Sequence, residues 1–404
     1  MDNPLRICHL GKYYPPANGG MESHVRVLAQ GQADLGAEVT VLCVNHRDSA
    51  GADVTWRSLA RTPAMSERDG PVRVLRVGRR ATVARLDLCP GLFGALNEVR
   101  CSGVDLFHLH TPNPTVLLAL VAWRRDVPLV VTHHSDVIRQ KLLGLALRPF
   151  ERLIYGRAAA LLTTSPAYAA GSAQLRRYAD RVQPLPLGIE LAPYLTPSEL
   201  ALKHAGLLRT RHPGPIWLSI GRLVYYKGLE NAVRALAEVP GTLLIVGTGP
   251  LEPKLKRLAA DVGVGERVIW CGKLDDDALV GAYQAATALW FPSNARSEGF
   301  GLVQLEAMAS GCPVINSRVP HSGVAWVCRH EREGLTTELN DPPAFAAAAR
   351  RLLDEPGLRS RLAEAGRARA VQEFDSHTMA RRSLDIYRMA LGIGRPAAAA
   401  AVPE

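Results

Sequence analysis

The sequence lacks the patterns that several large protein classes require. It contains no uninterrupted run of about 18 apolar residues, so we expect no membrane-spanning helix. Its first ten residues do not place a basic segment before a long apolar one, and we therefore expect no secretion signal. The seven cysteines form no Cys-x-x-Cys pair. This pattern favours reduced thiols in a cytoplasmic protein, and it predicts no metal site because no pair of ligands has metal spacing.

Two further absences concern partners and cofactors. Aromatic residues make up 6% of the chain and no dense run of lysine and arginine occurs, so we expect no binding to nucleic acid. The net charge of +10 then points to an anionic membrane surface or to a small molecule that carries phosphate. No Gly-x-Gly-x-x-Gly motif is present, and the nearest match, residues 246–250, is better explained as a tight turn. A nicotinamide enzyme is therefore disfavoured.

The 404 residues do show a repeated alternation of short apolar runs and amphipathic stretches. This alternation predicts an α/β protein with two Rossmann-like domains and parallel sheets, at residues 1–190 and 191–375. Residues 376–404 are expected to form a helix that returns to the first domain, followed by a disordered tail. The expected strands are 5–10, 38–44, 72–77, 104–108, 129–132, 160–164, 216–220, 243–246, 268–271, 288–291 and 313–316, the last of which closes the series. The principal expected helices are 21–35, 114–125, 228–238, 252–261, 275–285, 301–309 and 376–391.

The strongest candidate for a functional loop is residues 291–311. Ligands of such folds bind beyond the carboxyl ends of the strands, in a cleft that we expect the two domains to share. Gly299 and Gly301 leave backbone N–H groups at the start of a helix, where the helix dipole favours an anion. Glu298 and Glu306 lie two helical turns apart, and carboxylates are good acceptors for the vicinal hydroxyls of a nucleotide sugar. The structural alternative is a helix-capping acid and a solvated or paired glutamate.

A second loop, residues 219–230, carries two cations after a strand that ends at Gly221. Arg222 suits a diphosphate through its forked guanidinium, and Lys227 suits it as a point charge. In sugar transfer the nucleoside diphosphate is the leaving group, and its negative charge grows as the glycosidic bond breaks. Cations fixed at that place stabilise the transition state more than the ground state. The pair therefore predicts a catalytic role.

Two loops of the first half are weaker candidates. Gly19 and Gly20 permit close approach of the backbone to a phosphate before the next helix, although a plain turn explains them as well. Asn18 beside them is a candidate contact on the acceptor side.

The loop after the strand 129–132 contains two histidines. His133 is best explained as a structural histidine. His134 is a candidate for binding sugar hydroxyls or for shielding a developing positive charge. Asp136 suits an acceptor contact and a helix cap equally well.

The motifs Gly-Arg-Leu-Val-x-x-Lys-Gly (221–228) and Glu-Gly-Phe-Gly-Leu-x-x-x-Glu-Ala-Met-Ala (298–309) resemble those of glycosyltransferase family 4, which has the GT-B fold. The resemblance extends from the Gly-Gly loop to the last helix. It implies a GT-B hexosyltransferase that retains the anomeric configuration and uses neither a metal nor another cofactor. It implies that Arg222 and Lys227 bind the donor diphosphate, that Glu298 binds the hydroxyls of the donor sugar and that Glu306 binds the ribose. It also implies that the backbone of Phe300, Gly301 and Leu302 contacts the sugar and phosphate, that Gly20 contacts a phosphate, and that His134 lies beside the transferring sugar. Gly19 and Gly221 complete the predicted donor-binding set.

One segment departs from the commonest family pattern. Many members have a Gly-Gly turn where this chain has Ser-Arg-Val-Pro-His-Ser-Gly-Val (317–324). With residues 133–141, this variant resembles bacterial mannosyl- and rhamnosyltransferases of lipopolysaccharide O-antigen assembly. It implies a GDP-mannose-like donor and a saccharide or polyprenyl-linked acceptor. The alternatives are a UDP-sugar enzyme with a small-molecule acceptor, or a non-catalytic subunit that binds nucleotide sugars.

Residues 137–157 combine apolar side chains with Arg139, Lys141, Arg148, Arg152 and Arg157. A basic amphipathic segment of this kind suits an anionic membrane surface, and a lipid-linked acceptor would make such contact useful. An ordinary helix pair with a solvated basic face explains the pattern equally well. The expected location is the cytoplasm, with peripheral contact at the inner face of the cytoplasmic membrane as one possibility.

Overall fold

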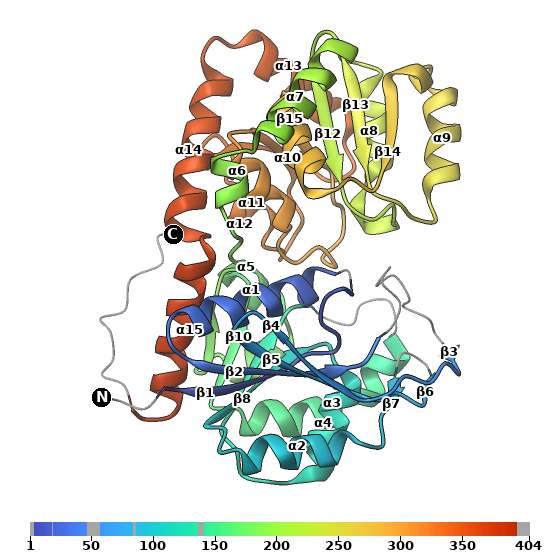
Figure 1. The fold of residues 1–404 in the computed structure, drawn as a ribbon. Helices are drawn as coiled ribbons and strands as arrows, with labels where there is room; N and C mark the ends of the chain where they lie inside the picture. The colour runs from blue at the N-terminus through green and yellow to red at the C-terminus, as the bar shows by residue number, and fades with distance from the viewer. Residues whose placement is uncertain (1–3, 18, 47–56, 84–85, 136–140, 394–404) are drawn as a thin grey trace. The chain divides into compact units, whose positions relative to one another are not determined.

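The computed structural model describes residues 4–17, 19–46, 57–83, 86–135 and 141–393. The chain divides into two compact units (Figure 1). Unit 1 comprises residues 1–188 and 376–404, and unit 2 comprises residues 189–375. The division lies between Gly188 and Ile189, whereas the expected first domain ends at residue 190. In the described part of the chain, every helix is too short or too polar to cross a bilayer.

Unit 1 is built on an eight-stranded sheet in the order β11-β10-β9-β8-β1-β2-β5-β4. Neighbouring strands are parallel except at the edge, where β4 pairs antiparallel with β5. The main strands are β1 (Arg6–Leu10), β2 (Glu38–Val44), β4 (Met65–Asp69), β5 (Val72–Val77), β8 (Leu106–Thr111), β9 (Leu129–His133), β10 (Ala160–Thr163) and β11 (Val182–Pro184). A small sheet of β3 (Arg57–Ser58), β6 (Ala81–Val83) and β7 (Leu86–Leu88) was not expected from the sequence.

Helices cover both faces of the unit 1 sheet. Successive residues of a strand point to opposite faces, so Ile7 and Cys8 of β1 belong to two different buried clusters. Burial on both faces explains why the central strands are rich in apolar residues on both of their faces. The helices are α1 (Gly20–Asp34) and α15 (Ser376–Ala390) on one face, and α2 (Leu92–Cys101), α3 (Pro114–Trp123) and α4 (Lys141–Arg157) on the other (Figure 1), with the short α5 (Pro166–Gly171) and η1 (Leu175–Tyr178) near the end of the unit.

The last helix, α15, follows unit 2 in the sequence and belongs to unit 1. Met379 and Tyr387 of α15 share a buried cluster with Leu28 of α1 and Leu162 of β10. The helix expected over residues 376–391 therefore completes the core of the first unit.

Unit 2 is built on a six-stranded, all-parallel sheet in the order β14-β13-β12-β15-β16-β17. The strands are β12 (Ile216–Ile220), β13 (Thr242–Val246), β14 (Val268–Gly272), β15 (Ala288–Phe291), β16 (Val314–Ser317) and β17 (Gly334–Thr337). The expectation that residues 313–316 close the series is wrong, because β17 follows. Its sequence Gly-Leu-Thr-Thr is short and has one large apolar residue, so no apolar run marks it.

The helices of unit 2 complete a doubly wound arrangement. Buried residues of α8 (Leu229–Leu236), α9 (Glu252–Asp261) and α13 (Pro342–Asp354) form one cluster on one face of the sheet. Helices α10 (Asp276–Ala285) and α11 (Leu302–Ala309) contact the sheet from the other face, as right-handed crossovers require. The remaining elements are α6 (Ala192–Leu195), α7 (Glu199–Arg211), η2 (Tyr225–Lys227), η3 (Gly265–Arg267), α12 (Val324–Val327) and α14 (Leu358–Glu373).

In each of the two large sheets, the parallel strands reverse their order at one place. In unit 2 the chain proceeds from β12 toward β14 on one side and from β15 toward β17 on the other, so the reversal lies between β12 and β15. In unit 1 the same reversal lies between β1 and β8. In open α/β sheets, ligands bind beyond the carboxyl ends of the strands at such a place.

Candidate active site

The loop after β12 is packed tightly enough to require glycine at two positions. Gly221 has φ +140°, and a Cβ atom on it would lie 2.9 Å from Cε of Lys227. Gly247, in the turn after β13, has φ +125°, and a Cβ there would lie 2.1 Å from the carbonyl oxygen of Gly221. The segment 246–250 is thus a close turn against this loop, as expected from its sequence. The side chain of Lys227 is folded back over the end of β12.

Lys227 and Glu298 form an ion pair at the reversal point of the unit 2 sheet. The distance from Nζ of Lys227 to Oε2 of Glu298 is 2.6 Å, and the two side chains are only 13% and 12% exposed. They meet because Lys227 follows β12, Glu298 follows β15, and these strands are neighbours. Nζ also lies 5.1 Å from the ring centroid of Phe291. The predicted diphosphate cation and the predicted sugar-binding acid are therefore in direct contact.

Arg222 is connected to this pair through Tyr226, a residue that was not predicted to belong to the site. Its Nη2 donates to the hydroxyl of Tyr226 over 3.0 Å, and the Tyr226 ring centroid lies 5.8 Å from Nζ of Lys227. A single tyrosine in a loop gives no signal by itself, since its role depends on the fold of the loop. Tyr226 places the second cation beside the first.

Glu306 of α11 is buried and hydrogen-bonded. The hydroxyl of Tyr283 in α10 donates to its Oε2 over 2.6 Å. Burial raises the pKa of the Glu306 carboxyl, while the hydrogen bond from Tyr283 and the positive charge of Lys227 oppose the shift. The positive charge of Lys227 therefore acts on both glutamates, through direct contact with Glu298 and through its electric field at Glu306.

The start of α11 also depends on glycine. Gly301 precedes the helix with φ +83°, and a Cβ atom on it would lie 2.7 Å from the Phe291 ring. The side chain of Phe300 is 3% exposed and packs against Phe374. Only the backbone of Phe300 is therefore available to a ligand. Leu302, which begins the helix, is half-buried.

The unusual segment 317–324 supports the loop that carries Glu298. The hydroxyl of Ser322 donates to the carbonyl oxygen of Glu298, and the backbone N–H of Gly323 donates to the carbonyl of Gly299 over 2.9 Å. Nε of Arg296 donates to the carbonyl of His321 over 2.8 Å. Residues that replace the common Gly-Gly turn thus fix the position of the candidate sugar-binding acid.

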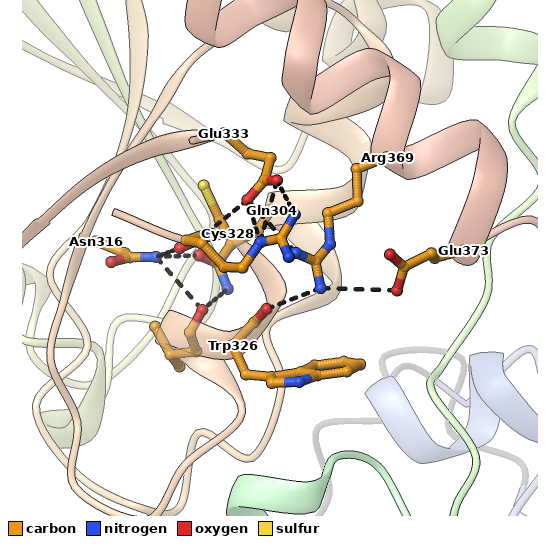
Figure 2. A network of polar contacts seen from close by, with 9 residues as sticks. Gln304, Asn316, Trp326, Cys328, Glu333, Arg369 and Glu373 are labelled. Carbon is orange, nitrogen blue, oxygen red and sulfur yellow. Dashed lines mark hydrogen bonds and ion pairs between the residues drawn. The ribbon is translucent and has the colours of Figure 1, made fainter. Parts of the chain in front are cut away.

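A buried polar network lies behind this loop (Figure 2). Nδ2 of Asn316 donates to Oε1 of Gln304 over 2.9 Å, and Nε2 of Gln304 donates to the carbonyl of Phe300 over 3.0 Å. On the other side of the network, the 5% exposed guanidinium of Arg369 lies 3.5 Å from Glu333. The two sides meet at α12 and the residue after it, because the carbonyl of Cys328 accepts from Asn316 over 3.1 Å and the carbonyl of Trp326 accepts from Arg369 over 3.2 Å. Side-chain hydrogen bonds thus connect the start of α11 to β16 and α14.

Unit 1 carries the remaining predicted residues. α1 begins at Gly20, where an added Cβ would meet open space, and Gly19 precedes it in an extended conformation. His134 follows β9 and is part of a buried cluster of imidazoles. Asn18 and Asp136 lie outside the described residues. His133 is buried, and its Nδ1 lies 2.8 Å from the hydroxyl of Tyr155, which agrees with the structural role expected for it.

The histidine cluster itself was not predicted. Five imidazoles gather at the reversal point of the unit 1 sheet, from β1, α1, β8 and the end of β9. Two groups of three have nitrogens within 4.8 Å of one another, a spacing that a metal ion could use. No local spacing in the sequence reveals them, because the sheet brings together strands that are far apart in the chain. The members are His9, His24, His108, His110 and His134.

A cavity of about 660 Å³ lies elsewhere in unit 1, between β5 and α2. Its lining includes Arg61, Arg76 and Arg79, and none of the predicted site residues contributes to it. Its position away from the ends of β1 and β8 gives no reason to join it to the candidate site.

Two family models match the chain, one in each half. Residues 19–188 match the glycosyl transferase 4-like domain, and residues 208–369 match the glycosyl transferases group 1. The second match contains Arg222, Lys227, Glu298 and Glu306.

Similar proteins agree with these matches. The chain is 32% identical over 270 residues to D-rhamnosyltransferase WbpZ of Pseudomonas aeruginosa, covering 67% of this chain and 70% of that protein. It is 26% identical over 389 residues to O-antigen chain mannosyltransferase C of Escherichia coli, covering 95% and 98%. The solved structure of sucrose-phosphate synthase from Thermosynechococcus elongatus matches with a TM-score of 0.75 and 25% identity, covering 96% and 100%. The fold, the loop motifs and these relatives together show that the chain belongs to glycosyltransferase family 4, with the GT-B fold.

Proposed function

We propose that the protein transfers a hexose from a GDP-mannose-like nucleotide sugar with retention of configuration. The acceptor in this proposal is a saccharide or a polyprenyl-linked saccharide of a cell-surface polysaccharide or lipopolysaccharide. Support comes from the names of the similar proteins, an O-antigen chain mannosyltransferase and a D-rhamnosyltransferase. The observation that carries the proposal is the Lys227–Glu298 pair at the strand-order reversal of unit 2.

The ion pair suggests how the donor is received. Without a donor, Glu298 is the counter-ion of Lys227. A diphosphate carries more negative charge than one carboxylate, so it would replace Glu298 as the partner of Lys227, with Arg222 as a second cation. The released carboxylate would then accept hydrogen bonds from the sugar hydroxyls. One contact thus couples diphosphate binding to sugar binding.

The same cations would act in the chemical step. As the glycosidic bond breaks, negative charge accumulates on the departing diphosphate, where Lys227 and Arg222 are already in place. Following the family resemblance, we propose that the donor phosphate takes the proton of the acceptor hydroxyl on the same face. With two fixed side-chain cations on the diphosphate, we propose that transfer needs no metal, so EDTA should leave turnover unchanged.

A thermal-shift screen with GDP, UDP, ADP and their sugars tests donor binding without an acceptor. A nucleotide at 100 times its Kd should stabilise the protein by about 2.7 kcal/mol. GDP and GDP-mannose should give the largest shift. A larger shift with UDP-sugars would replace the proposed donor, and no shift with any nucleotide would refute the proposed function.

Lys227→Ala tests the catalytic role. Loss of one charge-stabilising group should lower turnover by roughly 100-fold. The matched control is Lys254→Ala in the same unit, whose side chain is 64% exposed and 3.4 Å from Glu230. Equal turnover in the two variants would remove Lys227 from the mechanism.

We also propose peripheral contact of α4 with an anionic membrane at the cytoplasmic face. Leu145 and Leu153 of this helix are 52% and 61% exposed, beside the exposed Arg148 and Arg152. Such a face gains free energy both from burial of apolar area and from attraction to anionic lipids. Flotation with phosphatidylglycerol vesicles at low salt tests this. Leu153→Glu should abolish flotation, whereas Leu202→Glu, at a 52% exposed leucine of unit 2, should leave it unchanged.

A further inference from the structure

Hydrogen bonds join the last helix of unit 1 to the candidate site residue His134. Nε2 of Gln32 in α1 lies 2.7 Å from Oγ of Ser383 in α15, and Oε1 of Gln32 lies 2.7 Å from Nε2 of His9. Nδ1 of His9 lies 2.9 Å from Nε2 of His110, and Nδ1 of His110 lies 3.1 Å from Nε2 of His134. All five residues belong to unit 1. We call this series of hydrogen-bonded side chains the histidine chain.

Ser383 determines which group donates and which accepts in each hydrogen bond of the histidine chain. Its hydroxyl lies 2.6 Å from the carbonyl oxygen of Ala380, and a carbonyl oxygen only accepts hydrogen bonds. The single hydroxyl proton of Ser383 is therefore used, and its oxygen must accept from Gln32. This places the amide NH₂ of Gln32 toward α15 and its carbonyl oxygen toward His9. If the amide were reversed, Ser383 would have to donate its proton to the oxygen of Gln32. The oxygens of Ser383 and Ala380 would then lie 2.6 Å apart with no proton between them.

Tyr387 of α15 is consistent with the same direction. Its hydroxyl lies 3.2 Å from Nε2 of Gln32, from which it accepts. It then donates to Nδ1 of His108 over 2.6 Å, and Nε2 of His108 donates to the hydroxyl of Thr132 over 2.6 Å. Tyr387 and His108 thus each have one proton, and each donates it to one acceptor.

In each imidazole of the histidine chain, the hydrogen bond at one nitrogen determines the hydrogen bond at the other. A neutral imidazole has one N–H and one lone pair, so the role of one nitrogen determines that of the other. Burial lowers the pKa of His9 to about 4 and that of His110 well below its ordinary value, so both are neutral. His9 donates from Nε2 to Gln32 and accepts at Nδ1 from His110. His110 in turn accepts at Nδ1 from Nε2–H of His134.

We propose that Ser383 and Gln32 hold His134 as its Nε2–H tautomer, which leaves Nδ1 as a hydrogen-bond acceptor for a hydroxyl of the transferred sugar. Nδ1 of His134 makes no hydrogen bond to the described part of the chain. A lone pair there binds an O–H group and repels a phosphate oxygen, which has no proton to offer. The sugar contact rests on the proposed function, whereas the tautomer does not. Ser383, Gln32, His9 and His110 are positioning residues in this scheme.

A metal ion in the same cluster is the competing explanation. His24 is 2% exposed and neither of its nitrogens has a hydrogen-bond partner among the described residues. A nitrogen of His24 lies within 4.8 Å of nitrogens of His110 and His134. Both nitrogens of His110 are already engaged by His9 and His134. A metal bound by these three rings would have to break the histidine chain, so the two explanations exclude each other.

Nitrogen-15 NMR of the histidine side chains, recorded without donor, tests the tautomer. In the wild-type protein, His134 should carry its proton on Nε2 only. Ser383→Ala removes the anchor, so Gln32 becomes free to reverse and His134 should become a mixture of both tautomers. Turnover should fall about tenfold with little change in KM for the acceptor, the scale of one hydrogen bond. Ser383→Thr keeps the hydroxyl and should restore both properties.

Ser376→Ala, at the other buried serine of α15, is the matched control and should change neither tautomer nor turnover. An Nδ1–H tautomer of His134 in the wild type would overturn the proposal. So would an unchanged tautomer in Ser383→Ala, or stoichiometric metal in the untagged protein by mass spectrometry. A fixed tautomer in a protein that binds no nucleotide sugar would instead refute the proposed function and leave the histidine chain intact.

Discussion

Lowering the pH from 7.5 to 5.0 should destabilise unit 1 before unit 2. The five histidines of the described chain whose pKa is lowered by burial all belong to unit 1. Desolvation by burial lowers the pKa of His9 to about 4 and that of the largely buried His134 to about 3, from an ordinary value of 6.5. A depressed histidine pKa means that the unfolded chain takes up protons first. The stability that depends on these groups is complete above pH 6.5 and is lost as the pH falls toward the folded-state pKa values.

The magnitude follows from the two pKa values. At pH 5.0 an unfolded histidine is almost fully protonated, while His9 and His134 in the folded state are mostly neutral. The proton-linked loss is then about 2 kcal/mol for each residue, or about 4 kcal/mol for the two. His24, His108 and His110, whose pKa values burial also lowers, add to it. Since a whole domain is stable by roughly 5–15 kcal/mol, the change is large.

Urea unfolding at pH 7.5, 6.0 and 5.0, followed by pulsed deuterium labelling at one common pH, assigns the loss to peptides of each unit. Peptides of unit 1 should unfold at progressively lower urea concentration, mostly between pH 6.5 and 5.0, before most carboxylates titrate. His9→Gln should reduce the pH-dependent loss by about 2 kcal/mol. A constant midpoint for unit 1, or earlier unfolding of unit 2, would contradict the assignment of neutral buried histidines.

Three further predictions concern unit 2. Burial raises the pKa of Glu306, so the contribution of its protonated form to the free energy of unfolding is present below pH 4.5 and is lost as the pH rises. Glu306→Gln should therefore raise the Tm at pH 7.5 and leave it unchanged at pH 4.5. The same variant should weaken nucleotide binding. Gly228→Ala should distort the Lys227 loop and abolish the nucleotide thermal shift, because its Cβ would lie 2.0 Å from a carbonyl oxygen. Gly263→Ala, which has open space around the added Cβ, should keep the shift. Arg369→Met should cost roughly 3 kcal/mol in urea unfolding, whereas the 56% exposed Arg361 should tolerate the same change within about 0.5 kcal/mol.

The elements with strong apolar runs were predictable from the sequence. Strands β2, β5, β12 and β15 have the expected bounds, because strands that are buried on both faces are rich in large apolar residues. Even β5, which includes Arg73 and Arg76, has apolar residues at its other four positions. β17, with its two threonines, has no such run and was missed. α13 and α14 were also not assigned, since the series of strands was taken to end before them.

The candidate site was partly predictable for a different reason. Lys227 and Glu298 each follow a strand, which local sequence shows, and the close contact between them depends on the pairing of β12 with β15, which it does not. The histidine chain is an extreme case. His9 and His110 are 101 residues apart, and His9 and Gln32 belong to different elements. Only the strand order of the sheet brings these side chains together.

The late position of α15 in the sequence has a consequence for biosynthesis. Tyr387 and Met379 fill the same buried cluster as Ile7 and Leu28, so the first unit cannot close its interior until the second has been translated. A nascent chain that stops at residue 375 would expose that apolar surface and the amide of Gln32. Premature termination near the end of the message should therefore yield a protein that chaperones and proteases recognise by its N-terminal half.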